Sequence, residues 1–211
     1  MKQRRDFLKL LGAAPLALLG YKLAQMGVQV VDPKIYPTMD VSAQADTRGS
    51  FYSTVTPQGT LVHTSSGTNS LDWLLRGASV AGRPASADTL IRRDGLRYSL
   101  CPPGRRPYHA GRSRLELDGR VYSGNEVSAI LMGVELEQIG EQLCTFAQID
   151  SLAELIVLSG LAWGWRWPYS IWGHYDVAIP TGRRSDPQGF DYGSLQGFLY
   201  TRAKASGVSG L

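Results

Sequence analysis

A histidine and a carboxylate stand twelve positions apart in a late stretch of the chain that is rich in Gly and Pro. These residues are His174 and Asp186. An imidazole nitrogen and a carboxylate oxygen can supply two of the three protein ligands of an open catalytic zinc site. The chain has three histidines in all, and His63 follows the apolar pair Leu61-Val62 and precedes small polar residues. This pattern predicts a buried strand that delivers His63, as the third ligand, to a loop at the edge of a sheet.

The segments that must position these residues show alternating strand and helix patterns. Asp94-Gly95 between two apolar runs predicts a hairpin with a tight two-residue turn, because these residues tolerate positive φ angles. The apolar spacing of residues 146–165, with acidic residues early, predicts a core-packed helix. Strands are expected at 60–63, 89–93, 96–100, 129–136 and 171–174, and further helices at 70–78 and 192–204. This order predicts a single-domain α/β fold with a central, mostly mixed β-sheet flanked by helices.

Length and charge limit the classes of function. With 211 residues, 43% of them hydrophobic, the chain can bury one sizeable core. The net charge is +4, but residues 1–45 hold six Lys or Arg against three Asp, a net +3, which leaves +1 for residues 46–211. A nearly neutral globular part argues against a nucleic-acid partner.

The N-terminus accounts for most of the positive charge. Arg4-Arg5 stands before Phe7-Leu8-Lys9 and an apolar run from Leu10 to Leu19, a pattern typical of a twin-arginine export signal. The run is shorter than the roughly 20 residues of a stable membrane span. The alternative is that this N-terminal segment forms an amphipathic first helix of the domain. We therefore expect export to the periplasm or cell envelope.

The same region sets the expected domain boundary. Residues 20–50 have the composition of a linker, so residues 1–45 are expected to be signal or anchor plus linker, and residues 46–211 the folded domain. Ala43-Gln44-Ala45 fits a cleavage pattern but lies far from the apolar run. The alternative is an uncleaved anchor with N-terminal membrane association.

Two cysteines, Cys101 and Cys144, lie far apart in the sequence. They could pair in an oxidising compartment or be buried as small apolar residues. Neither has the spacing of a zinc finger.

Five segments in order resemble the type-2 N-acetylmuramoyl-L-alanine amidases, a zinc family that also includes peptidoglycan recognition proteins and some phage endolysins. The resemblance covers most of residues 55–195, and it implies an amidase-2 or peptidoglycan-recognition-like fold. The matching segments are Leu61-Val62-His63-Thr64, residues 86–95, Pro107-Tyr108-His109-Ala110-Gly111, Gly133-Val134-Glu135-Leu136-Glu137, and Gly173-His174 through Ser185-Asp186-Pro187.

This resemblance assigns roles to particular residues. It implies that His63, His174 and Asp186 bind Zn²⁺ and that Glu135 is the catalytic carboxylate. It also implies that Arg184 stabilises the oxyanion and that His109 and Thr64 contact substrate. Two positions depart from the family pattern: Arg184 stands where lysine is usual, although the two residues are not interchangeable at a close site, and Asp88 stands where many members have histidine.

The implied activity is hydrolysis of the amide bond between N-acetylmuramic acid and L-alanine in peptidoglycan or muropeptides. A three-ligand zinc site can lower the pKa of water to about 7, and Glu135 can carry the proton to the leaving amine. A non-catalytic peptidoglycan-binding recognition module on the same fold is the alternative, and a phage or prophage endolysin is a third reading. The form of the substrate and the oligomeric state stay open.

Overall fold

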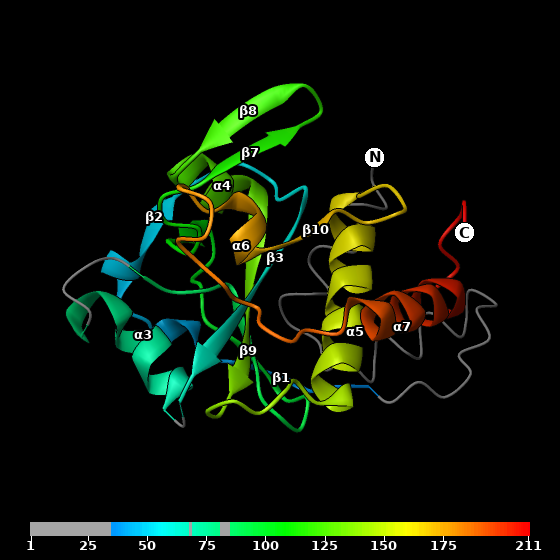
Figure 1. Cartoon of the computed structure of the whole chain (residues 1–211), viewed down its shortest axis with the longest axis horizontal. Coiled ribbons are helices and arrows are strands. Elements are labelled where there is room, and N and C mark those ends of the chain that lie inside the picture. The colour runs from blue at the N-terminus through cyan, green and yellow to red at the C-terminus, as the bar shows by residue number, and fades with distance from the viewer. Residues whose placement is uncertain (1–34, 68, 81–84) are drawn as a thin grey trace.

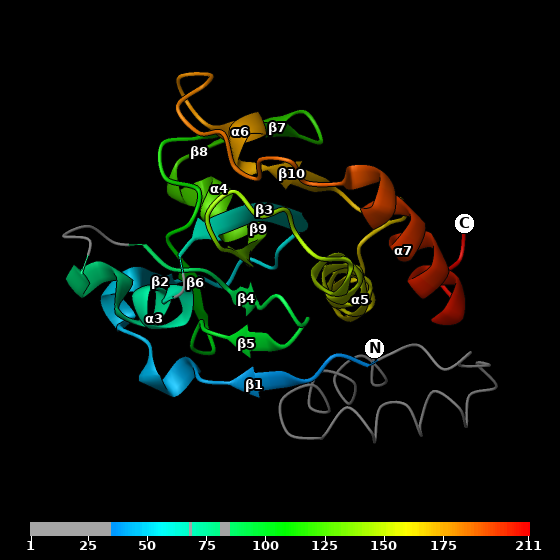
Figure 2. The ribbon, with the colours of Figure 1, turned by 60° about the horizontal axis from the view of Figure 1, so that its bottom comes forward.

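The computed structural model describes residues 35–67, 69–80 and 85–211. A six-stranded sheet runs through the centre of the molecule (Figure 1), and its strands lie in the order β1-β5-β4-β9-β3-β10 (Figure 2). Its strands are β1 (Thr38–Asp40), β3 (Gly59–Ser66), β4 (Thr89–Ile91), β5 (Arg97–Ser99), β9 (Leu131–Gln138) and β10 (Ile171–Gly173). All neighbouring pairs are parallel except β4 with β5. The predicted mixed α/β sheet is therefore confirmed. The predicted export signal and its apolar run lie outside the described residues.

Helices cover both faces of this sheet (Figures 1 and 2). The helices α5 (Phe146–Trp163) and α7 (Tyr192–Ala205) pack on one face, where they share a core with the strands. The opposite face is covered by α3 (Ser70–Val80), α4 (Asn125–Ile130) and α6 (His174–Val177). The smaller elements are β2 (Ser50–Tyr52) paired with β6 (Arg105–Pro107), β7 (Arg114–Leu117) paired with β8 (Arg120–Ser123), and the short helices η1 (Ser42–Gln44) and η2 (Thr47–Gly49).

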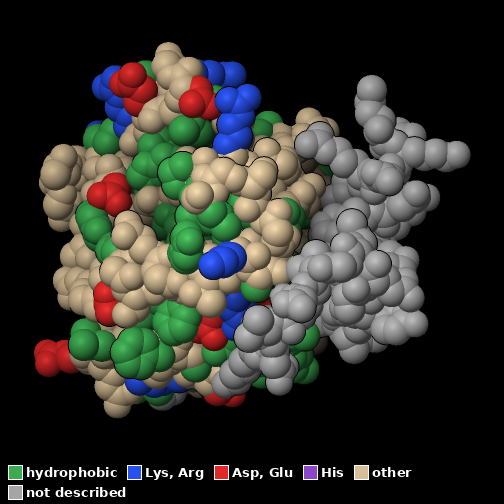
Figure 3. All heavy atoms as spheres, turned by 90° about the vertical axis from the view of Figure 1, so that its right-hand side faces the viewer, with side chains coloured by type: hydrophobic (Ala, Val, Ile, Leu, Met, Phe, Trp, Pro, Cys, Tyr) green, Lys and Arg blue, Asp and Glu red, His purple; other side chains and the backbone are tan. Residues whose placement is uncertain are grey.

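The hairpin of β7 and β8 projects from one end of the molecule. Charged side chains of both signs gather at this end, which is the top of the face shown in Figure 3. The exposed charged residues of the hairpin are Arg114, Glu116, Asp118 and Arg120.

Strand alternation decides which side chains reach the site. Successive residues of a strand point to opposite faces, so Val62 and Val134 enter the core under α5. Leu61 and His63 point to the other face, as does Glu135 on the neighbouring strand. The apolar pattern of the two central strands thus directs two chemically active side chains to one face of the sheet.

Helix α5 forms the centre of the larger core. It begins with a capping box between Thr145 and Gln148 and ends at Gly164, whose φ is 73°, so it stops two residues before the predicted end. Its mean hydropathy of 1.3 reaches that of a membrane-spanning helix. However, Ile149, Leu152 and Ile156 are at most 2% exposed inside the protein, so α5 serves as a core helix.

The linker predicted over residues 20–50 is wrong for residues 36–50. Strand β1 pairs with β5 at the edge of the sheet, and Tyr36 is only 3% exposed. The Tyr36 hydroxyl donates to Asp150 and its backbone N–H donates to Glu154. A three-residue edge strand has too few positions to show a period, and tertiary contacts hold it in place. The fold thus begins before residue 46.

The connection between β4 and β5 also differs from the prediction. Five residues, 92–96, link the two strands. Gly95 has a positive φ of 90°, whereas Asp94 does not have a positive φ. The Gly95 N–H donates to the Arg92 carbonyl, and a longer loop with one left-handed glycine is a common hairpin closure.

Both cysteines are free thiols, so the disulfide alternative is wrong. Each lies half-buried in its own surroundings: Cys144 packs against the core under α5, while Cys101 lies near Asp88 and Arg106. Burial raises the pKa of Cys101 to about 12 and that of Cys144 to about 11. Both are therefore thiols, not thiolates, near neutral pH.

Candidate functional site

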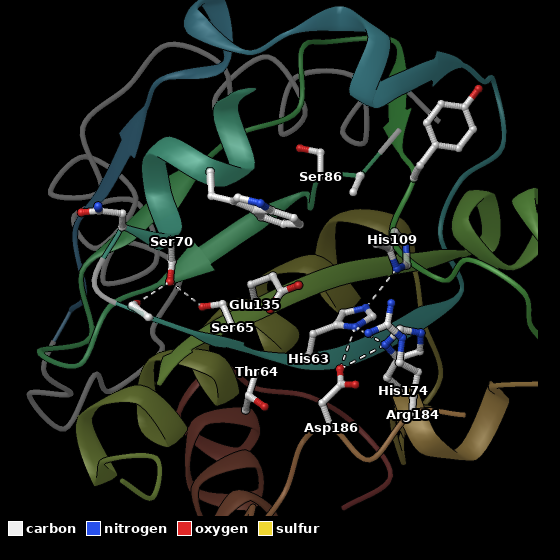
Figure 4. A pocket seen from close by; sticks show the side chains of 15 residues that line it. His63, Thr64, Ser65, Ser70, Ser86, His109, Glu135, His174, Arg184 and Asp186 are labelled. Carbon is white, nitrogen blue, oxygen red and sulfur yellow. Dashed lines mark hydrogen bonds and ion pairs between the residues drawn. The ribbon is translucent and has the colours of Figure 1, made fainter. Parts of the chain in front are cut away.

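The three residues predicted as metal ligands meet on the face of the sheet opposite α5 (Figure 4). His63 comes from β3, His174 begins α6 directly after β10, and Asp186 follows in the next loop. The two Nδ1 atoms lie 3.0 Å apart. Asp186 Oδ2 lies 3.0 Å from Nδ1 of His174 and 3.3 Å from Nδ1 of His63. One detail of the prediction is corrected: β3 continues to Ser66, so His63 lies within the strand and not at the edge of the sheet.

The partners behind the two rings determine where their protons lie. His174 Nε2 is 3.1 Å from the Ala110 carbonyl oxygen, which can only accept, so this nitrogen carries the hydrogen. His109 Nε2 faces the carbonyl oxygens of Leu131 and Ser128 and likewise donates. His109 Nδ1 is then an acceptor for His63 Nε2, at 3.2 Å. In neutral rings, the Nδ1 atoms of both His63 and His174 therefore carry lone pairs.

Burial and neighbouring groups shift the pKa values of the side chains in this cluster. It lowers the pKa of His63 to about 4 and that of His109 well below its ordinary value, so both rings are neutral near pH 7. Burial acts to raise the pKa of Asp186, yet contacts with His174 and His63 hold it below its ordinary value. A neutral His63 ring thus lies beside the Asp186 carboxylate.

This donor set fits a metal ion. Three lone-pair-bearing atoms within 3.3 Å of one another repel each other unless a cation lies between them. Ligand atoms at about 2.0–2.1 Å from a tetrahedral ion lie about 3.3 Å apart, close to the separations observed here. The cluster of His63, His174 and Asp186 can therefore hold a metal ion with a fourth position free.

Glu135 lies beside this cluster on β9. It lines the same cavity, and its Oε2 atom is buried without a hydrogen-bond partner among the described residues. Burial, followed by the nearby charge of Asp186, raises the pKa of Glu135 to about 8, although Arg184 opposes this shift. A carboxyl group that is buried, unpartnered and titrates near neutrality can both take up and release a proton.

The two neighbouring arginines have different positions. Arg183 binds backbone carbonyls: its Nε donates to Ile179 at 3.0 Å and its Nη2 to Arg112 at 2.7 Å. Arg184 instead lines the cavity, and Figure 4 shows its guanidinium beside the two histidines. The structure thus places Arg184, and not Arg183, where it can act on a bound molecule.

The remaining predicted residues lie at the border of the site. His109 lines the cavity but is 8% exposed, and its ring stands behind His63. The Thr64 side chain points away from His63 (Figure 4), as strand alternation requires. Asp88, at the position where many family members have histidine, accepts from the Gly133 N–H at 2.8 Å and pairs with Arg106. Asp88 therefore holds β9 in place.

One wall of the cavity was not predicted from the sequence. From the metal cluster the cavity extends along α3, where Trp73 lines it together with Tyr108. Trp73 is 38% exposed. It stands among leucines in the helix predicted at 70–78, and nothing in that pattern singles it out as lining a cavity. The other residues along this wall are small or polar: Ser65, Gly67, Asn69, Ser70, Ala85 and Ser86.

Comparisons with known proteins agree with this geometry. Residues 53–189 match the family described as N-acetylmuramoyl-L-alanine amidase. The 1,6-anhydro-N-acetylmuramyl-L-alanine amidase AmpD of Enterobacter cloacae is 34% identical over 130 residues, or 59% of this chain. That match spans 62% of the relative, less than two thirds of its length.

Solved structures share the fold. The crystal structure of a selenomethionine AmpD derivative matches with a TM-score of 0.59 and 25% identity, over 78% of this chain and 94% of that chain. Staphylococcus aureus hydrolase AmiA, in complex with its ligand, matches with a TM-score of 0.56 over 89% of this chain and 93% of that chain. At 13% identity, the second match shows the fold alone.

Proposed function

Because this chain belongs to the N-acetylmuramoyl-L-alanine amidase family, we propose that it is a zinc-dependent amidase of peptidoglycan. It would hydrolyse the amide bond between the lactyl group of N-acetylmuramic acid and L-alanine of the stem peptide. One observation carries this proposal: three lone pairs converge from His63, His174 and Asp186 beside the buried, unpartnered carboxyl oxygen of Glu135. A recognition module needs no such arrangement.

The proposed mechanism divides the work between the metal and the chain. When bound, zinc polarises an amide carbonyl and lowers the pKa of water towards 7. Glu135 accepts the proton of the water that attacks the carbonyl carbon, and it then donates this proton to the nitrogen of the leaving L-alanine. The pKa of Glu135 is raised towards neutrality in the metal-free chain, and a nearby cation favours its carboxylate form, which is the base that the first transfer needs.

Arg184 supplies the second positive charge of the site. Its guanidinium borders the cavity near Glu135 and His63, where the former carbonyl oxygen gains negative charge during attack. Removal of one such charge-stabilising donor typically lowers the rate by about 10² to 10³. Because Arg183 is bound to backbone carbonyls, Arg184 alone of the pair is free for this role.

The cavity has the surface that a sugar-peptide substrate requires. Trp73 and Tyr108 offer aromatic surface, and the hydroxyls of Ser65, Ser70 and Ser86 offer hydrogen bonds. Sugars and short peptides combine apolar faces with many polar groups, which such mixed walls bind. We therefore place the muramyl peptide along α3, with its scissile amide at the metal cluster.

The location of the substrate agrees with the export signal predicted from Arg4-Arg5. Peptidoglycan lies outside the inner membrane, so an enzyme acting on the intact polymer must cross it. If the signal acts as proposed, residues 1–45 will export a folded reporter, and a double Arg4→Lys, Arg5→Lys change will retain it inside the cell. Export that is unaffected by the double change would contradict the twin-arginine proposal.

The activity is tested by digestion of purified peptidoglycan and soluble muropeptides with the zinc-loaded chain. Mass spectrometry should detect stem peptides with a free L-alanine amine, and a chelator should prevent their release. A Glu135→Gln variant should bind zinc and muropeptide but release no peptide. If the zinc-bound wild-type chain binds muropeptide but releases no peptide, the chain is instead a recognition module. A chain that neither binds muropeptide nor releases peptide would contradict both functions.

A further inference from the structure

Two consecutive residues contact both metal-binding histidines from behind. His109 Nδ1 accepts from His63 Nε2 at 3.2 Å, and the carbonyl oxygen of the next residue, Ala110, accepts from His174 Nε2 at 3.1 Å. The pair His109-Ala110 thus contacts the far nitrogen of each ring whose near nitrogen faces the proposed metal.

The pair is itself held firmly. Ser128 Oγ accepts from the backbone N–H groups of both residues, at 3.3 Å for His109 and 3.1 Å for Ala110. His109 Nε2 donates to the Leu131 carbonyl at 3.1 Å. His109 is 8% exposed and Ser128 is 1% exposed, so water does not compete freely for these hydrogen bonds.

Strand β9 makes room for the His109 ring at Gly133. A Cβ atom added at Gly133 would lie 2.5 Å from His109 Cγ, closer than two carbon atoms can approach. The Gly133 N–H is in turn held by Asp88. Glycine at this position allows the ring to lie against the strand and to face His63.

We infer that His109-Ala110, fastened by Ser128, fixes the tautomers of both metal-binding histidines. His109 is accordingly a positioning residue and does not primarily contact substrate. A neutral imidazole with its hydrogen held on Nε2 must present its lone pair at Nδ1, which here faces Asp186. Loss of such an outer hydrogen bond typically costs 10- to 100-fold in metal affinity. This inference rests on the proposed zinc site.

The test compares variants of the full chain at His109. Replacement by Phe keeps a planar ring but removes the acceptor, whereas Asn retains an oxygen that can accept from His63. Competition with a chromophoric chelator should show zinc affinity lowered 10- to 100-fold in His109→Phe and largely restored in His109→Asn. Tyr108→Phe, which leaves the His109 contacts intact, is the matched control and should keep wild-type zinc affinity.

Three results would overturn the inference in distinguishable ways. Unchanged zinc affinity in His109→Phe, with a raised KM for muropeptide, would assign His109 to substrate binding and leave the amidase standing. Equal losses of zinc affinity in His109→Phe and His109→Asn would show that the hydrogen bond to His63 does not determine the affinity. A wild-type chain that binds no zinc would refute the proposed function, and this inference with it.

A measurement on the wild-type chain covers the case in which His109→Phe does not fold. Nitrogen-15 NMR of labelled histidine reports which ring nitrogen carries the hydrogen. The inference predicts the Nε2–H tautomer for both His63 and His174. An Nδ1–H tautomer in either ring would contradict it.

Discussion

His63 and Glu135 are direct partners in register across the parallel strands β3 and β9. The proposed metal ligand and the proposed proton carrier therefore leave the sheet on the same face and at the same level. The same register pairs Val62 with Val134 in the core under α5. A slip of one residue would turn these valines out of the core under α5 and send the active side chains to the wrong face. Core packing thus fixes the geometry of the chemistry.

Zinc should stabilise the folded chain. The three ligands converge only in the native state, so binding adds about 2.7 kcal/mol at a zinc concentration of 100 times Kd. For a domain of this size, that raises Tm by about 5 to 10 °C, as measured by thermal unfolding with and without zinc. Asp186→Asn should lose most of the increase, whereas the exposed Glu116→Gln should keep it. An equal increase in both variants would show that zinc binds elsewhere.

Arg184 and Arg183 should respond differently to replacement by alanine. Arg184→Ala is expected to lower kcat/KM by about 10² to 10³ with zinc affinity and Tm unchanged, because it removes a charge at the reacting oxygen. Arg184→Lys should recover part of the rate. Arg183→Ala should lower stability by about 1 kcal/mol, because it removes the hydrogen bonds from Arg183 to the carbonyls of Ile179 and Arg112, and should largely spare the rate. Reversed effects would move the oxyanion role to Arg183.

The stability of the metal-free chain should depend on pH through Glu135. Its folded-state pKa of about 8 lies above the ordinary value of 4.5, so between these values the folded state holds a proton that the unfolded state has lost. Stability therefore falls as pH rises from about 4.5 to 8, by at most about 1.4 kcal/mol per pH unit. Glu135→Gln cannot lose this proton, so its stability relative to wild type should increase with pH.

Urea unfolding in the presence of a chelator at pH 5, 6.5 and 8 measures this difference. With zinc in place of the chelator, this stability difference should depend less on pH, since a nearby cation favours the carboxylate. A stability difference between wild type and Glu135→Gln that does not vary with pH would show that Glu135 titrates normally in the folded state.

The convergence of the three proposed ligands was predictable from the sequence, because each of them stands next to a strong local pattern. His63 follows an apolar run, and His174 and Asp186 flank a Gly- and Pro-rich loop. The central strands and the long helix α5 were likewise predictable, since each contains enough residues to show its period. The bounds predicted for these elements lie within a few residues of the observed bounds.

Other features depend on contacts that no local pattern records. Strand β1 is ordered by pairing with β5 and by Tyr36, and its three residues show no period. The choice between Arg183 and Arg184 depends on which carbonyls lie nearby. The place of His109 behind His63 requires the close approach that Gly133 allows. These relationships exist only once the strands are assembled.

The anomalous diffraction signal of zinc, recorded from a crystal of the zinc-loaded chain, would locate the metal directly. We expect one strong peak about 2.0–2.2 Å from Nδ1 of His63, Nδ1 of His174 and a carboxylate oxygen of Asp186, with Glu135 beside the open position. A zinc ion bound elsewhere, or bound through Nε2 of either histidine, would contradict it.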